Sequence, residues 1–226
     1  MGNMDKIALK FGFWSAIIVT ISIIVFMVSL VLTFTPNLAA WDGIEIYTSN
    51  FKPMQMFTVF PSIIMACAYV VFTVAIHYYA QEGKKIFSHL SIAFGLMYAI
   101  ISVANYLIQI ITVIPSIEKQ YLNGLDLLVA GYPNSIFFAL MASYFFMCVS
   151  AFFVSLVFNN EKGQKSIKIL FLGSVCSIPI CLLCISMDLN VLMPLAGIIW
   201  FICFIFGLIK VAILFINYDK LNRIKN

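Results

Sequence analysis

Long stretches without charge divide the chain. Six of them contain no Asp, Glu, Lys or Arg, and they cover residues 11–41, 53–81, 86–117, 127–160, 169–187 and 189–209. A helix needs about 20 apolar residues to cross the hydrocarbon core of a bilayer. Each stretch has room for one crossing, so we predict membrane-spanning helices over residues 12–34, 55–79, 88–114, 135–158, 167–186 and 192–215.

The predicted fold is all-α, a single transmembrane domain over residues 1–226 built as a bundle of six helices. An α-helix pairs its own backbone groups in lipid, whereas an open strand leaves them unpaired. The stretches also lack the alternation of polar and apolar residues that is typical of membrane barrels. Little more than residues 187–190 separates the last two spans, which predicts a tight helical hairpin.

Composition supports a membrane protein and argues against a soluble one. Of the 226 residues, 63% are hydrophobic and only 10% are charged. Soluble domains carry about a quarter charged residues, because water must meet a polar surface. The net charge of +4 is not gathered into a dense basic run, so a nucleic-acid partner is not expected.

The placement of Lys and Arg predicts the orientation. Six spans put the N-tail, the second and fourth connections and the C-tail on one side of the membrane. That side carries Lys6, Lys10, Lys84, Lys85, Lys162, Lys165, Lys168, Lys220, Arg223 and Lys225, and the other side carries Lys52 and Lys119. Because basic residues favour the cytoplasmic side, we predict a plasma-membrane protein with both termini in the cytoplasm.

The third predicted span carries polar residues at steps of three and four, which place them on one helix face. They are Ser91, Gly95, Tyr98, Ser102, Asn105, Tyr106 and Gln109. Amides that face lipid would stay unpaired at a cost of kilocalories each, so this face must look into the bundle. Two interpretations stay open: hydrogen bonds that join helices, or a polar pocket that opens outward.

Other spans offer partners for that face. Ser143 and Tyr144 lie in the fourth span, and Trp200 lies in the outer half of the sixth. The candidate ligand-binding residues are therefore Tyr98, Ser102, Asn105, Tyr106, Gln109, Ser143, Tyr144 and Trp200. Pro61 and Pro179 lie inside spans and are candidates for kinks.

Ionisable and metal-binding residues are scarce in the spans. No Asp or Glu occupies a span centre, which argues against a proton pump built on a buried carboxylate. Lys210 lies near the inner end of the sixth span, and His77 and His89 flank the second connection. We expect these three side chains at the membrane surface, and we predict neither a metal site nor a cofactor.

The six cysteines lie in predicted spans, and no structural disulfide is expected. Cys181 and Cys184 form a C-x-x-C pair, which resembles the redox pair of quinone-linked enzymes such as the vitamin K epoxide reductase family. Those enzymes also use a second cysteine pair in an outer loop, and this chain has none. An intramembrane thiol oxidoreductase is therefore one hypothesis, and Cys as a small hydrophobic residue is the alternative.

The region from the third span to the fourth resembles bacterial six-helix integral membrane proteins of unknown function. The resemblance rests on the segments Ser102–Gln109, Asn123–Leu125 and Tyr132–Ser135, together with Glu118. It extends over most of the chain in layout, and it implies no activity and no catalytic residue. It does single out the face around Asn105 and Gln109.

Three functions remain open on the sequence. The first is a non-enzymatic membrane protein that binds or passes a small solute or lipid through an outward-facing polar pocket. The second is a structural or interaction subunit, in a homo-oligomer or beside a partner membrane protein. The third is the thiol oxidoreductase of Cys181 and Cys184. The chain carries no phosphate-binding loop, H-E-x-x-H or G-x-S-x-G motif, which favours the non-enzymatic functions.

Overall fold

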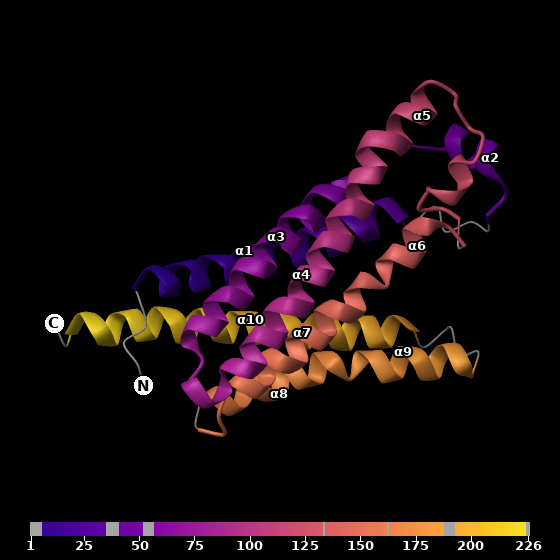
Figure 1. Cartoon of the computed structure of the whole chain (residues 1–226). Coiled ribbons are helices and arrows are strands. Elements are labelled where there is room, and N and C mark those ends of the chain that lie inside the picture. Colours follow the sequence, from indigo (N-terminus) through magenta and orange to yellow (C-terminus); the bar gives the residue numbers. More distant parts are fainter. Residues whose placement is uncertain are drawn as a thin grey trace.

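The computed structural model describes residues 6–34, 41–51, 57–132, 134–161, 163–187 and 193–224, and every regular element among them is helical (Figure 1). Five helical segments in this part are long and apolar enough to cross a bilayer. They are Lys6–Ser29, Val59–Tyr79, Glu82–Glu118, Ile136–Val157 and Leu195–Asn217. The chain is thus a multi-pass helical membrane protein.

The first layer of the bundle joins α1 (Lys6–Phe34), α3 (Val59–Tyr79) and α10 (Met193–Ile224). Gly12 lets α1 approach α10, because a Cβ atom there would overlap the buried ring of Phe215. Pro61 lies in the first turn of α3. Backbone N–H groups in a first turn have no acceptor within the helix, so the missing N–H of proline costs no hydrogen bond there. The position of Pro61 therefore makes it a helix-start residue and not the cause of a kink.

The third predicted span is one long helical rod with a widened turn. It contains α4 (Lys85–Ile108), a π-helical turn (Gln109–Val113) and α5 (Ile114–Glu118). The Ile114 N–H donates to the Gln109 carbonyl, five residues back. Pro115 explains this turn, since a proline ring clashes with the carbonyl four residues before it, here that of Ile111. The pattern of apolar residues did not predict the π-turn.

The fourth predicted span consists of two helices in line, α6 (Ile136–Met141) and α7 (Ser143–Val157). The Ser135 hydroxyl caps α6 by accepting a hydrogen bond from the Phe138 N–H at 3.5 Å. Pro133 lies outside the described residues. The chain turns once at Ala142 between the two helices.

The span expected over residues 167–186 is also interrupted. It forms α8 (Gln164–Val175) and α9 (Ser177–Ser186), with a turn at Cys176. Pro179 accounts for the break because it cannot donate to the Val175 carbonyl. Neither helix alone has the length of a span, and the hairpin expected at residues 187–190 lies mostly outside the described residues.

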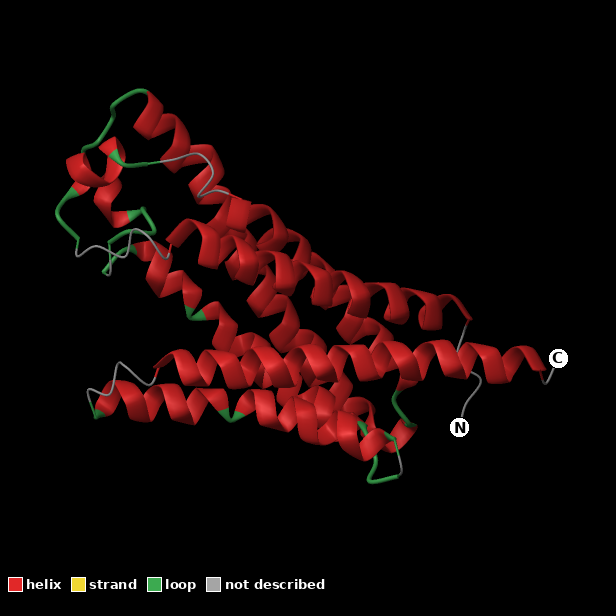
Figure 2. Ribbon diagram, turned by 180° about the vertical axis from the view of Figure 1, so that it is seen from behind, coloured by secondary structure: helices red, strands yellow, loops and turns green. Residues whose placement is uncertain are grey.

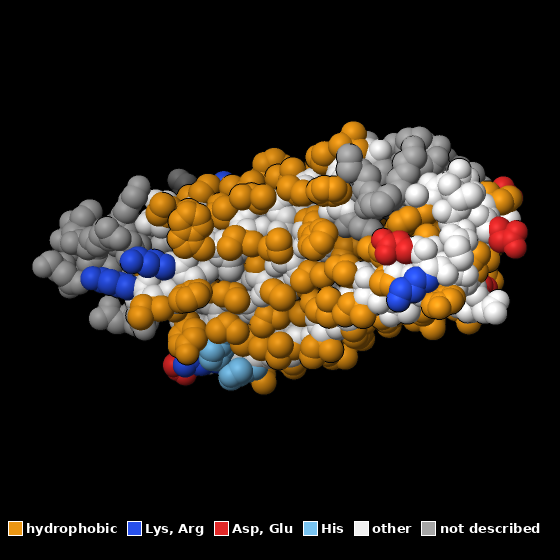
Figure 3. Space-filling view, turned by 90° about the horizontal axis from the view of Figure 1, so that it is seen from above, with side chains coloured by type: hydrophobic (Ala, Val, Ile, Leu, Met, Phe, Trp, Pro, Cys, Tyr) orange, Lys and Arg blue, Asp and Glu red, His pale blue; other side chains and the backbone are white. Residues whose placement is uncertain are grey.

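Successive long helices run in opposite directions, as Figures 1 and 2 show, so the start of α1 and the end of α10 lie at the same end. We call this the termini end and the opposite one the cap end. A wide hydrophobic band separates the charged side chains of the two ends (Figure 3). This band is the surface that a bilayer would cover.

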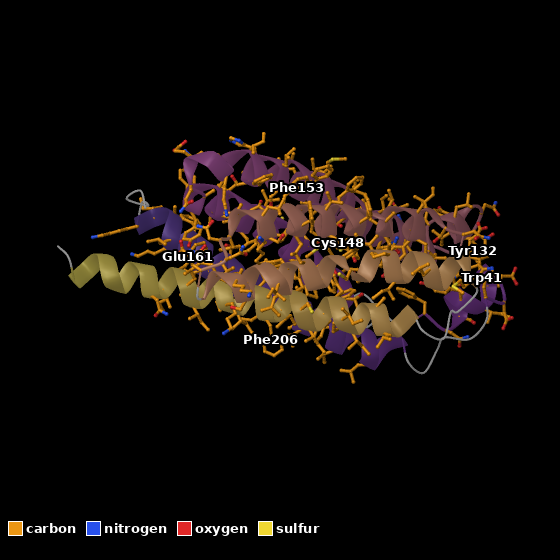
Figure 4. All side chains as sticks on the ribbon, turned by 90° about the horizontal axis from the view of Figure 1, so that it is seen from below. Trp41, Tyr132, Cys148, Phe153, Glu161 and Phe206 are labelled. Carbon is orange, nitrogen blue, oxygen red and sulfur yellow. The ribbon has the colours of Figure 1, made fainter. Side chains whose placement is uncertain are left out.

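A small cap folds over the cap end. It consists of α2 (Ile44–Ser49) and residues 119–132, which include the 3₁₀ turn Leu125–Leu127. Its core joins Leu125 and Val129 to Val113 of the π-turn and Ile117 of α5, with Trp41, Tyr47 and Tyr132 packed against them. Trp41 and Tyr132 lie together at one end of the molecule and Glu161 lies at the other (Figure 4).

Two details of the cap differ from the sequence expectations. The short helix α2 was not predicted, and neither was the 3₁₀ turn Leu125–Leu127. Gly131 is needed for packing, since a Cβ atom there would lie 2.5 Å from the Tyr47 ring. Burial raises the pKa of Tyr47 to about 12, so this phenol stays neutral at ordinary pH.

Candidate functional site

The polar face of α4 and the π-turn is buried between helices. Tyr98, Ser102, Asn105, Tyr106 and Gln109 are each at most 2% exposed. They come from successive turns of one rod, and α7, α6 and the cap lie against them in that order towards the cap end. The expectation that the Asn and Gln side chains look into the protein is confirmed.

A serine layer lies deepest towards the termini end. The Ser150 hydroxyl of α7 donates to the Ser91 carbonyl at 2.7 Å, and the two hydroxyl groups are 3.1 Å apart. The Tyr69 hydroxyl of α3 donates to the Ser150 oxygen at 3.0 Å. This layer joins α3, α4 and α7, and it contains Ser91 but none of the eight candidate ligand-binding residues.

The next layer brings four candidate residues together. The hydroxyl oxygens of Ser102 and Ser143 are 2.8 Å apart, and those of Tyr106 and Tyr144 are 3.2 Å apart. Tyr106 also donates to the sulfur of Met141 at 3.6 Å. The bonds link α4 to α6 and α7 through uncharged groups only.

The two amides bind carbonyl groups where the helices are irregular. The Asn105 Nδ2 donates to the Phe137 carbonyl at 3.2 Å, in the short helix α6. The Gln109 Nε2 donates to the Leu128 carbonyl of the cap at 2.8 Å. Such carbonyl groups are accessible because the local backbone does not use both of their lone pairs.

Two buried polar atoms stand out in this site. The Gln109 Oε1 makes no hydrogen bond within the described residues, although the side chain is only 1% exposed. The Tyr98 hydroxyl, beside Ser102 and Tyr144, makes no well-formed bond there either. An unpaired buried acceptor or donor costs about 1–3 kcal/mol, so native proteins rarely keep one without a reason.

Tyr144 and Trp200 form the edge of the site. The Tyr144 ring lies 5.4 Å from that of Tyr98 and 6.3 Å from that of Trp200, between ring centroids. Both Tyr144 and Trp200 are half-buried, unlike the residues of α4. Tyr144 therefore contacts Tyr98, Tyr106 and Trp200, and Ser102 pairs with Ser143. Asn105 and Gln109 bond instead to the backbone carbonyl groups of Phe137 and Leu128.

Sequence reasoning missed several members of this network. Ser150 and Tyr69 were not selected, although Ser150 lies seven residues after Ser143 and so shares its helix face. That spacing was a usable signal. The carbonyl partners at Phe137 and Leu128 had no sequence signal, because any residue can supply a carbonyl group.

The other chemical candidates lie elsewhere. Among the described residues, Cys67, Cys148, Cys176 and Cys203 form no disulfide bond. The side chains of Cys181 and Cys184 lie outside the described residues. In the part of the chain that the structure describes, no three His, Cys, Asp or Glu side chains gather as a metal site.

No family model, no curated protein and no solved structure matches this chain.

Proposed function

We propose that the chain crosses the plasma membrane six times, with both termini in the cytoplasm. α8 and α9 together supply the sixth crossing, bent at Cys176, in addition to the five long segments. The shared termini end supports an even number of crossings. The described Lys6, Lys84, Lys85, Lys165 and Lys168 belong to the starts or connections of helices at that end, which favours a cytoplasmic side.

Within that arrangement, the polar face of α4 binds or passes a small uncharged solute or lipid from the outer side. The observation that carries this proposal is the buried, unpaired Oε1 of Gln109. It lies on the π-turn, and π-turns inside α-helices occur frequently at functional sites. A bound hydroxyl or amide group would donate to this oxygen and remove its desolvation cost.

The chemistry of the eight candidate residues limits the ligand. They offer hydroxyl, phenol, carboxamide and indole groups, and none of them is charged. A charged ligand would need an opposite charge to enter an apolar site, because desolvating an ion is costly. The site therefore fits an uncharged molecule with a hydroxyl or amide group, and the half-buried Tyr144 and Trp200 provide aromatic surface for its apolar part.

Native mass spectrometry of the detergent-solubilised protein tests this proposal. We expect a co-purifying uncharged molecule on the wild-type chain and its loss in Gln109→Leu, which removes the acceptor. Ser150→Ala is the matched control, since it alters the serine layer outside the candidate site. A wild-type protein that never carries such a mass, or a Gln109→Leu variant that carries it equally, would contradict the proposal.

A structural or interaction subunit is the second candidate function. The hydrogen bonds of Ser102, Asn105 and Tyr106 support it, because they join helices without any ligand. The resemblance to uncharacterised bacterial six-helix membrane proteins is compatible with either function. Purification with a fixed partner subunit, together with no bound small molecule, would favour this function.

The thiol oxidoreductase remains the third hypothesis. If this hypothesis is correct, trapping of thiols in oxidised membranes should capture a disulfide between Cys181 and Cys184. Two thiols that stay free under those conditions would remove it.

A further inference from the structure

The two histidines of the chain form a pair at the termini end, away from the polar site. His77 lies in the last turn of α3 and His89 lies near the start of α4. Their ring centroids are 4.4 Å apart with planes inclined by 35°. The pale blue side chains in Figure 3 show the pair at the surface, beside charged side chains.

Hydrogen bonding fixes which nitrogen of His77 carries the proton. The buried Ser88 hydroxyl donates its one proton to the Lys85 carbonyl at 2.8 Å. The same oxygen lies 2.9 Å from the His77 Nδ1, so it must accept from an Nδ1–H. The neutral ring then keeps a free lone pair on Nε2, which is the form that binds a metal ion.

From this geometry we propose that His77 and His89 bind a transition-metal ion between α3 and α4. Histidines that bind metals usually donate their other N–H to a fixed acceptor, and the Ser88 oxygen supplies it here. His89 is exposed, so its ring is free to turn its own lone pair towards the ion. Imidazole nitrogen suits Zn²⁺, Cu²⁺ and Ni²⁺, and not Mg²⁺ or Ca²⁺.

The neighbouring side chains determine how tightly the two histidines would hold a metal ion. No third His, Cys, Asp or Glu in the described part of the chain completes a cluster with the pair, so water would fill the remaining positions. Glu82 and Lys85 are the charged groups that act on His77, and they form an ion pair with each other. The site is thus open, exchangeable and close to neutral, with Cu²⁺ bound more tightly than Zn²⁺.

Calorimetric titration of the full-length protein in detergent with Zn²⁺ tests the proposal, with the affinity tag removed so that no other histidine is present. One ion per chain should bind at pH 7.5. His77→Ala and His89→Ala should each abolish binding, and Ser88→Ala should weaken it about 10-fold or more. Cys176→Ser is the control for thiol binding and should bind as the wild type does.

Two results would overturn the site. One is a wild-type protein that binds no Zn²⁺ at millimolar concentration. The other is equal binding by His89→Ala, a variant expected to fold because this side chain is exposed.

Discussion

At the residue scale, periodicity was enough to find the polar face of α4. Steps of three and four placed Ser102, Asn105 and Gln109 together, and apolar surroundings required them to face protein. The bonds themselves were not predictable, because they depend on how α6, α7 and the cap approach α4. The carbonyl of Leu128 comes from a loop whose path no helical pattern describes.

The pair Ser102 and Ser143 gives the first prediction. Ser102→Ala should destabilise the protein by about 1 kcal/mol, because the Ser143 hydroxyl stays buried without this partner. The double variant Ser102→Ala with Ser143→Ala should cost less than the sum of the single variants, by about 0.6 kcal/mol. Unfolding in denaturant-containing mixed micelles measures the free energy of unfolding of the two single variants and of the double variant. Strict additivity would show that the two hydroxyl groups do not interact.

At the element scale, the charge-free stretches predicted where the helices lie, but they did not predict where those helices are broken. Pro179 was recognised as a possible kink, and the chain does break three residues before it at Cys176. The π-turn before Pro115 and the short helix α2 were missed. The π-turn follows from Pro115, whereas α2 depends on local packing, because Ile44 and Tyr47 of this short helix pack against the cap core.

The contact between α1 and α10 gives the second prediction. Gly12→Ala places a methyl group against the buried ring of Phe215 and should destabilise the protein by about 1–3 kcal/mol. Gly197→Ala is the matched control, because nothing lies within 4 Å of its added Cβ atom on α10. Thermal unfolding in detergent compares the two. Equal stability of Gly12→Ala and the wild type would mean that α1 and α10 are not this close.

The cap gives the third prediction, through the phenol of Tyr47. Its pKa is raised from about 10 in an unfolded chain to about 12 in the folded protein by burial. The stability that depends on the neutral phenol is complete below pH 10 and is lost as the pH rises through 12. Trp41 fluorescence should report opening of the cap in that range, since the two rings lie 5.9 Å apart.

The control for the cap is Tyr47→Phe in a background without Trp14 and Trp200. This variant keeps the aromatic ring but cannot ionise, so its fluorescence should stay constant over the same pH range. An identical alkaline transition in both proteins would assign the change to another group.

At the scale of the whole molecule, apolar stretches predicted a helical membrane bundle, and five segments have the necessary length and composition. The sixth crossing could not be established in the same way, because α8 and α9 are each too short and are joined at a bend. The side of the membrane depends on charge placement and not on packing, so the fold alone leaves it open.

Topology gives the fourth prediction. Cysteines introduced at the exposed positions Asn160 and Asn123 lie in connections at opposite ends. In intact cells, a membrane-impermeant thiol reagent should label Asn123→Cys, and it should label Asn160→Cys only after lysis. Labelling of Asn160→Cys from outside would reverse the proposed orientation.

An experimental structure of the protein in a lipid nanodisc tests the central claim most directly. We expect non-protein density about 3 Å from the Gln109 Oε1, with the Nε2 still bonded to the Leu128 carbonyl. A Gln109 side chain turned towards acyl chains, or one whose Oε1 binds only protein groups, would contradict the claim that this face holds an uncharged ligand.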